Sequence, residues 1–135
     1  MITLPHVSPV AILVGTLLGF VLGALWYGPV FGKAWMAENG FTAETIKADF
    51  NPLKLYGSTF VLGLLASYVF GLAVGPDPDL LYAVGAGLAA GVFWIGTSFA
   101  TSYLFEKKSL RHFLINAGYH ALQFGLIGLA FGLFG

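Results

Sequence analysis

The chain has 135 residues, of which 58% are hydrophobic and 9% are charged, with six basic and six acidic side chains and no cysteine. A soluble domain carries roughly 25% charged residues, so this composition predicts a protein embedded in a lipid bilayer. The balanced charge gives no electrostatic basis for binding nucleic acid, and the lack of cysteine excludes disulfides and thiolate chemistry.

Four long apolar stretches predict four transmembrane helices in one all-α domain over residues 1–135, at roughly 9–29, 54–75, 80–105 and 112–134. Each is long enough to cross a hydrocarbon core of about 30 Å, which needs about 20 helical residues. The first stretch lacks a basic leading region and a small-residue cleavage site, so we interpret it as a permanent helix and not as a signal peptide. The predicted architecture is a four-transmembrane-helix bundle.

The first span ends in the stretch GALWYGPVFGKAWM, residues 23–36. Aromatic rings favour the headgroup region, and a Gly-Pro pair bends or ends a helix, so residues 26–36 predict an elbow with a short interfacial helix at the membrane surface. A further short helix, capped by Thr42, precedes the second span. The elbow is either a membrane-surface element alone or part of a ligand site. Its key residues are Trp26, Tyr27, Gly28, Pro29 and Trp35.

Glycines recur every four residues on two of the spans. The series are Gly15, Gly19 and Gly23 on the first span, and Gly87 and Gly91 on the third. Lipid supplies no hydrophobic drive for helix association, so small residues that let backbones approach closely mark packing faces. The spacing predicts tight packing, either within the bundle or between subunits of a homo-oligomer.

Polar residues gather in one half of the third and fourth spans. The fourth span carries His112, Asn116, Tyr119, His120 and Gln123 within an arc of about 100°, and the third carries Ser98 and Ser102 on one face with Gly87, Gly91 and Trp94. Polar groups at membrane depth usually face inward and pair. Two interpretations remain: a hydrogen-bond network that fixes helix register, or a cavity that binds a polar molecule or passes protons, in which His120 would act.

The connections between the spans predict the orientation. All six basic residues lie on one side, in the first and third connections or, for Lys54, at the adjoining end of the second span, whereas the second connection, GPDPD, carries only Asp77 and Asp79. By the positive-inside rule the first and third connections face the cytoplasm, and both termini face the exterior of an inner or plasma membrane.

Chemical motifs are lacking. His112 and His120 are eight residues apart, about 12 Å along a helix, too far to share one metal ion. The sequence contains no paired acids within a span and no HExxH, GxSxG or phosphate-loop motif. We therefore expect no enzyme activity, no cofactor and no metal.

Two segments carry a resemblance to a known family. GALWYGPVFGKAWM at 23–36 and YLFEKKSLRHFLINAGYHALQFGLIG at 103–128 resemble the family called domain of unknown function 1761, over essentially the whole chain. The family-like positions are Trp26, Tyr27, Gly28, Pro29, Gly32, Trp35, Gly118, Tyr119 and His120. The resemblance implies a small bacterial-type integral membrane protein without an assigned activity, and it adds no catalytic residue.

These observations predict a non-enzymatic membrane protein that acts as an oligomerising structural or interaction protein, or as an accessory subunit of another membrane protein. The alternative is a small transporter or channel for small molecules, ions or protons that uses the polar cluster. Under the predicted topology, the elbow and the polar cluster lie at the same membrane depth. We therefore predict that the elbow covers the cluster, with Trp26 or Tyr27 near Tyr119 and His120.

Overall fold

The computed structural model describes residues 6–135, and all regular secondary structure in that range is helical. The first five residues of the predicted domain lie outside this range. The elements are α1 (Pro9–Leu25), the π-helix η1 (Trp26–Val30), α2 (Gly32–Asn39), α3 (Ala43–Ala48), α4 (Pro52–Val74), α5 (Leu80–Ala90), the π-helix η2 (Gly91–Gly96), α6 (Thr97–Phe105) and α7 (Leu110–Phe134). Four continuous helical stretches, 9–30, 52–74, 80–105 and 110–134, are long and apolar enough to cross a membrane, which confirms the predicted fold class.

Side-chain caps set where the four long helices begin. Each cap accepts a hydrogen bond from the backbone N–H three residues ahead, which satisfies one of the free donors at a helix start. The caps are Ser8, Asn51, Asp79 and Ser109. The caps at 51 and 109 let the second and fourth long helices begin at residues 52 and 110, two residues before the predicted starts.

The connection between α1 and α4 contains the predicted interfacial helix, α2, and a second short helix, α3. The Gly-Pro pair does not end the first span. Instead the helix widens into the π-turn η1, in which the Phe31 N–H donates to the Trp26 carbonyl at 2.8 Å. Proline lacks an N–H and crowds the carbonyl four residues back, so a wider turn accommodates Pro29. Thr42 caps α3 through a reciprocal pair of bonds with Thr45, as the sequence predicted.

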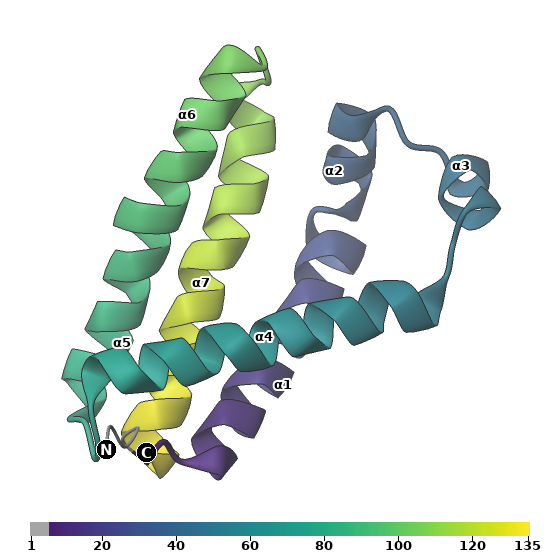
Figure 1. Ribbon diagram of the computed structural model, residues 1–135. Coiled ribbons are helices and arrows are strands. Elements are labelled where there is room, and N and C mark those ends of the chain that lie inside the picture. The colour runs from purple at the N-terminus through teal and green to yellow at the C-terminus, as the bar shows by residue number, and fades with distance from the viewer. Residues whose placement is uncertain (1–5) are drawn as a thin grey trace, which may run out of the picture.

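Helix α7 lies at the centre of the bundle, between α1 on one side and α5, η2 and α6 on the other. Figure 1 shows α5 and α6 running alongside α7, with the start of α1 and the end of α7 at the same end of the bundle, where the Ser8 hydroxyl donates to the Phe134 carbonyl. Glycines bring the backbones together. Gly87 lies against the Phe124 carbonyl, and Gly128 lies against the Ala83 carbonyl. The glycine series on α1 also faces α7, because the nearest groups to Gly19 and Gly23 are Gln123 and Tyr119.

The second π-helix changes the register of the third span. A π-turn inserts one extra residue, so the residues after it are rotated from the positions expected for an uninterrupted α-helix. The buried face therefore steps by five, from Gly91 to Gly96, and continues to Tyr103. Trp94, predicted to share the face of Gly87 and Gly91, is instead 75% exposed.

Helix α4 packs against α1 from its middle, where Phe60 faces Phe20 and Gly63 lies against Thr16, to its C-terminal end. Its buried residues are Ser67, Phe70 and Gly71. Ser67 lies 3.3 Å from the Thr16 hydroxyl of α1, and Phe70 joins the core cluster with Phe131 of α7. The preceding part of α4 diverges from α5, α6 and α7. Figure 1 shows α4 crossing the view from side to side, whereas α5, α6 and α7 run up and down the view. This divergence leaves space between α4 and the elbow.

Candidate functional site

Both π-helices contact one stretch of α7, residues 115–121. From η1, the Trp26 indole N–H donates to the Ile115 carbonyl at 2.8 Å, and the Trp26 ring lies beside Gly118. From η2, Gly91 lies against the backbone of Ala121. π-Helical turns are rare and are frequent at functional sites, so their meeting on this stretch makes it the candidate site.

A chain of hydrogen bonds joins three helices across the site. The Tyr27 hydroxyl of η1 donates to the Asn116 side-chain oxygen at 2.7 Å. The Asn116 side-chain nitrogen then donates to the Tyr103 hydroxyl of α6 at 2.6 Å. The two ends of one amide are thus both used, one toward each neighbouring helix, and Asn116 fixes the position of α7 between them.

Tyr119 ties α7 to α1 one turn farther along. Its hydroxyl donates to the Gly19 carbonyl at 3.0 Å, and its ring lies 5.3 Å from that of Tyr27. The Tyr27 ring also packs edge-on against Trp35 of α2 at 5.5 Å. Tyr27, one of the two elbow residues expected near Tyr119 and His120, therefore lies against Tyr119, whereas the ring contacts of His120 are with Phe99 and Tyr119.

His120 is directed toward α6 and makes a separate group of contacts. Its Nδ1 lies 2.7 Å from the Gln123 side-chain oxygen, and its ring stacks on Phe99 at 5.3 Å with 14° between the planes. The Tyr119 ring packs edge-on against the His120 ring, with 4.9 Å between the ring centroids. These contacts fix the imidazole orientation. Because an amide oxygen can only accept, Nδ1 is the donor in the bond to Gln123.

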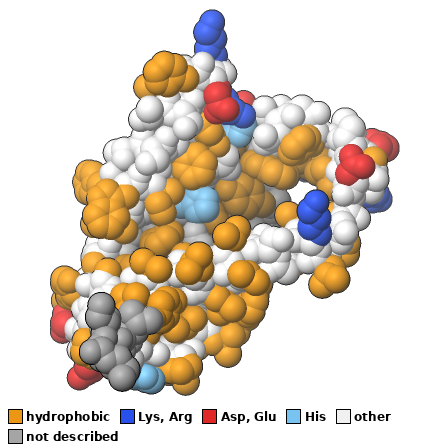
Figure 2. All heavy atoms as spheres, in the orientation of Figure 1, with side chains coloured by type: hydrophobic (Ala, Val, Ile, Leu, Met, Phe, Trp, Pro, Cys, Tyr) orange, Lys and Arg blue, Asp and Glu red, His pale blue; other side chains and the backbone are white. Residues whose placement is uncertain are grey.

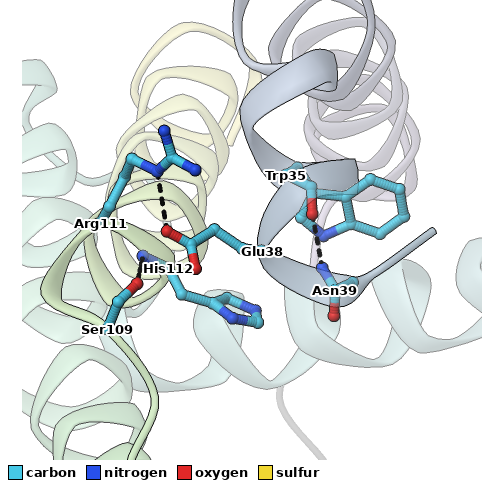
Figure 3. Close-up of polar contacts among 6 residues, drawn as sticks. All are labelled: Trp35, Glu38, Asn39, Ser109, Arg111 and His112. Carbon is cyan, nitrogen blue, oxygen red and sulfur yellow. Dashed lines mark hydrogen bonds and ion pairs between the residues drawn. The ribbon is translucent and has the colours of Figure 1, made fainter. Parts of the chain in front are cut away.

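An ion pair ties the elbow to the start of α7. The Arg111 Nε donates to Glu38 of α2 at 2.7 Å, as Figure 3 shows. This bond, with a smaller effect from the Ser109 hydroxyl, holds the pKa of the Glu38 carboxyl below its ordinary value, so the pair stays charged at neutral pH. Next to it, His112 is buried and packs edge-on against the Tyr103 ring at 5.1 Å.

The structure brings most of the predicted site residues together, but not all. Asn116, Tyr119 and the elbow aromatics form one connected group, with His112 and His120 at its edges. Ser98 and Ser102 do not join it. Both are exposed and line a groove along the third span together with Phe99 and Tyr103. The extra residue of η2 rotates them away from the face on which an α-helical spacing would have placed them.

Several contributors were not identified from the sequence. Tyr103 and Phe99 face the site because of the same rotation, which periodicity at 3.6 residues cannot reveal. The Thr16–Ser67 contact and the Glu38–Arg111 pair join residues 51 and 73 positions apart in the chain. The only available signal was their polarity within or beside apolar spans.

A large cavity lies on the other side of the elbow, between α1 and the diverging part of α4. Its volume is about 850 Å³. The lining residues are Gly19, Phe20, Gly23, Ala24, Tyr27, Gly28, Trp35, Ile46, Phe50, Leu55, Tyr56, Thr59 and Tyr119. Tyr27 and Tyr119 therefore belong both to the hydrogen-bonded site and to the wall of this cavity.

The polar side chains of the site form hydrogen bonds between helices. Within residues 6–135, every buried side-chain nitrogen and oxygen has a hydrogen-bond partner. The same range contains no group of three His, Cys, Asp or Glu side chains able to hold a metal ion. The bonds reach from α7 to α1, η1 and α6, so they fix the relative register of these helices.

The comparison with sequence families agrees with the resemblance carried by the two motif segments. A profile of the family described as "Protein of unknown function (DUF1761)" matches residues 10–132. Neither a search of curated proteins nor a search of solved structures gives a match. The matched range includes the elbow, the polar stretch of α7 and all four long helices, and on this basis the chain belongs to the DUF1761 family.

Proposed function

We propose that this protein is a non-enzymatic integral membrane protein that works by association, as a homo-oligomer or as an accessory subunit of a membrane complex. The observation that supports this most strongly is the use of the polar residues. Four side chains form their hydrogen bonds with neighbouring helices of the same chain: Trp26, Tyr27, Asn116 and Tyr119. A site built for catalysis or transport would keep such groups available for a substrate.

Transport, the alternative function, would need a polar path through the other half of the bundle. In that half of the described chain, the buried polar side chains are Thr16 and Ser67, and they contact each other. Two hydroxyls that satisfy one another do not line a hydrated path, so the association proposal fits the geometry better.

The outer face of α4 is the surface we assign to association with a second copy. It is strongly apolar, with Val61 62% exposed and Leu62 64% exposed. Figure 2 shows the hydrophobic side chains that cover α4 where it crosses the lower part of the view. Association between membrane helices relies on direct packing, and the exposed side of α4 offers apolar surface for it.

Cysteine cross-linking tests this assignment cleanly because the chain has no native cysteine. We expect Leu62→Cys protein, oxidised in native membranes, to give a covalent dimer, because a two-fold pair brings identical positions together. Leu104→Cys is the matched control, since Leu104 is 80% exposed on α6. Native mass spectrometry in mild detergent should show a homo-oligomer or a complex. A monomer in detergent and equal cross-linking of both variants would contradict the proposal.

We further propose that the connections around α2–α3 and between α6 and α7 face the cytoplasm, because every basic residue of the chain lies in them or in the first turn of the long helix that follows. Asp77→Cys and Lys108→Cys test this orientation in intact cells. A membrane-impermeant maleimide should label the first from outside and the second only after permeabilisation. The reverse pattern would invert the orientation.

A further inference from the structure

The cavity between α1 and α4, beside the elbow, is walled by aromatic rings, and we call it the aromatic cavity. Two ring systems form its walls: Tyr27 packs against Trp35 and Tyr119 at 5.5 and 5.3 Å, and Phe50 packs against Tyr56 at 6.0 Å. Its volume of about 850 Å³ lies within the range of about 300–1,000 Å³ that is usual for ligand pockets. In Figure 2 the surface is hollowed between α4 and the α2–α3 segment.

The lining has little left to offer a polar ligand. The hydroxyls of Tyr27, Tyr119 and Thr59 already donate to Asn116, the Gly19 carbonyl and the Leu55 carbonyl. No charged residue is among the lining residues, and the donors left over are the Tyr56 hydroxyl and the Trp35 indole N–H. A ligand that needs many hydrogen bonds would lose its water and regain few bonds, whereas a hydrocarbon chain loses nothing. The lining chemistry therefore selects an apolar chain.

The shape of the floor also suits a chain. Gly19, Gly23, Ala24 and Gly28 follow α1 along one side of the cavity, and a Cβ added at Gly28 would meet open space. Nine residues of helix correspond to about 14 Å, so the floor is an extended, smooth track. Because α1 and α4 are both long and apolar enough to cross a membrane, a chain can enter between them from the side.

The surroundings favour a chain that carries a polar head. Ile46, Phe50 and Leu55 line one end of the cavity. Their sequence neighbours Lys47, Asp49 and Lys54 are exposed, so this end adjoins polar surface. A lipid could place its head there and its chain along α1, as amphiphiles do at a membrane interface.

We propose that this cavity binds one hydrocarbon chain of a membrane lipid, either the acyl chain of a phospholipid or a polyprenyl chain. The chain lies along α1 from Gly19 to Gly28, under the rings of Trp35 and Tyr27. This function is separate from association through Val61 and Leu62 of α4, because neither residue lines the cavity.

Tryptophan fluorescence provides the test, because the chain has three tryptophans in different surroundings. The variant W26F/W94F retains only Trp35, in the cavity wall, and W26F/W35F retains only Trp94, 75% exposed on the outer surface. Each is reconstituted into dioleoylphosphatidylcholine vesicles with a rising fraction of the chain-brominated lipid, whose bromine quenches indole on contact. To compare the shapes of the curves, the quenching of each variant is normalised to its own maximum.

Brominated and unbrominated chains of the same lipid compete equally for a position, so the shape of each curve reports how many chains touch the indole. We expect the Trp35 signal to fall in direct proportion to the brominated fraction, because one bound chain touches that ring, and the Trp94 signal to fall more steeply at low fractions, because several lipids surround an exposed ring. Ala24→Phe, which fills the floor, should lower the total Trp35 quenching reached in fully brominated lipid. Leu25→Phe is the matched control, because Leu25 is 53% exposed and does not line the cavity. If the Trp35 and Trp94 quenching curves coincide in protein that keeps Ala24, or if Ala24→Phe leaves the quenching of Trp35 unchanged, the proposal is wrong.

Two further arms complete the experiment. Added unbrominated polyprenol that restores Trp35 fluorescence identifies a polyprenyl chain, and no recovery identifies an acyl chain; both results support the site. If the protein is a dimer and Trp35 is protected from all quenching, a second copy of the chain fills the cavity. That result would overturn the proposal of a lipid site. If W26F lowers the helix content measured by circular dichroism, the single variants W94F and W35F are compared in the same way.

Discussion

Replacing Gly87 with alanine is expected to be the most destabilising single-methyl change in the bundle. The added Cβ would overlap the Phe124 carbonyl, a backbone group that cannot rotate aside. Helix α5 would have to move away from α7, which loses packing along the most extensive helix contact of the fold. Overpacking of this kind costs about 1–3 kcal/mol, and we expect the upper end because the obstacle is backbone.

The measurement is unfolding in detergent by rising mole fraction of sodium dodecyl sulfate, followed by tryptophan fluorescence. Gly85→Ala is the control, because Gly85 lies on the same helix with open space around its added Cβ. It should be neutral or slightly stabilising, since alanine is the better helix former. If both variants unfold at the same detergent fraction, close approach of α5 to α7 through Gly87 is wrong.

Replacing Asn116 with leucine should be the largest effect among the polar residues. Leucine nearly preserves the side-chain volume but removes both bonds of the amide, so the hydroxyls of Tyr27 and Tyr103 lose their partner. A part-buried group left without a partner costs about 1–3 kcal/mol, and measured interhelical bonds in membranes reach about 1.7 kcal/mol. We expect a loss of about 1–2 kcal/mol in the same unfolding assay.

A double-mutant cycle with Tyr27→Phe separates the bond from the general effect of substitution. The two changes should be less than additive, with a coupling of about 0.6 kcal/mol or more, because each removes the same hydrogen bond. Tyr82→Phe serves as the control, since Tyr82 is 56% exposed, and should cost almost nothing. Additive costs for Tyr27→Phe and Asn116→Leu would show that the two residues do not stabilise each other.

The elbow illustrates how far local sequence reaches. Its aromatic residues, the Gly-Pro pair and the Thr42 cap predicted a surface segment with short helices, because capping and headgroup preference depend on neighbouring residues alone. That Trp26 would donate to the carbonyl of Ile115 could not be predicted. Such a bond depends on how two helices 89 residues apart are rotated about their axes.

The third span shows the opposite case. An α-helical wheel placed Ser98 and Ser102 with Gly87 and Gly91, whereas η2 adds a residue to the turn and directs Gly96, Phe99 and Tyr103 toward α7. A π-turn is held by packing on both sides more than by a residue motif, so the sequence alone favoured the commoner geometry. The composition of the predicted polar cluster changed accordingly.

The sequence by itself determined that the chain forms four apolar helices joined by short polar segments, because helix length and hydropathy follow from local composition. It also determined the positions of most polar side chains along each helix. Only the tertiary structure decided which of those side chains meet, that α4 diverges from the bundle and that an aromatic cavity opens beside α1. These features arise from contacts between distant segments, and lipid leaves helix rotation and tilt to be set by close packing and interhelical hydrogen bonds.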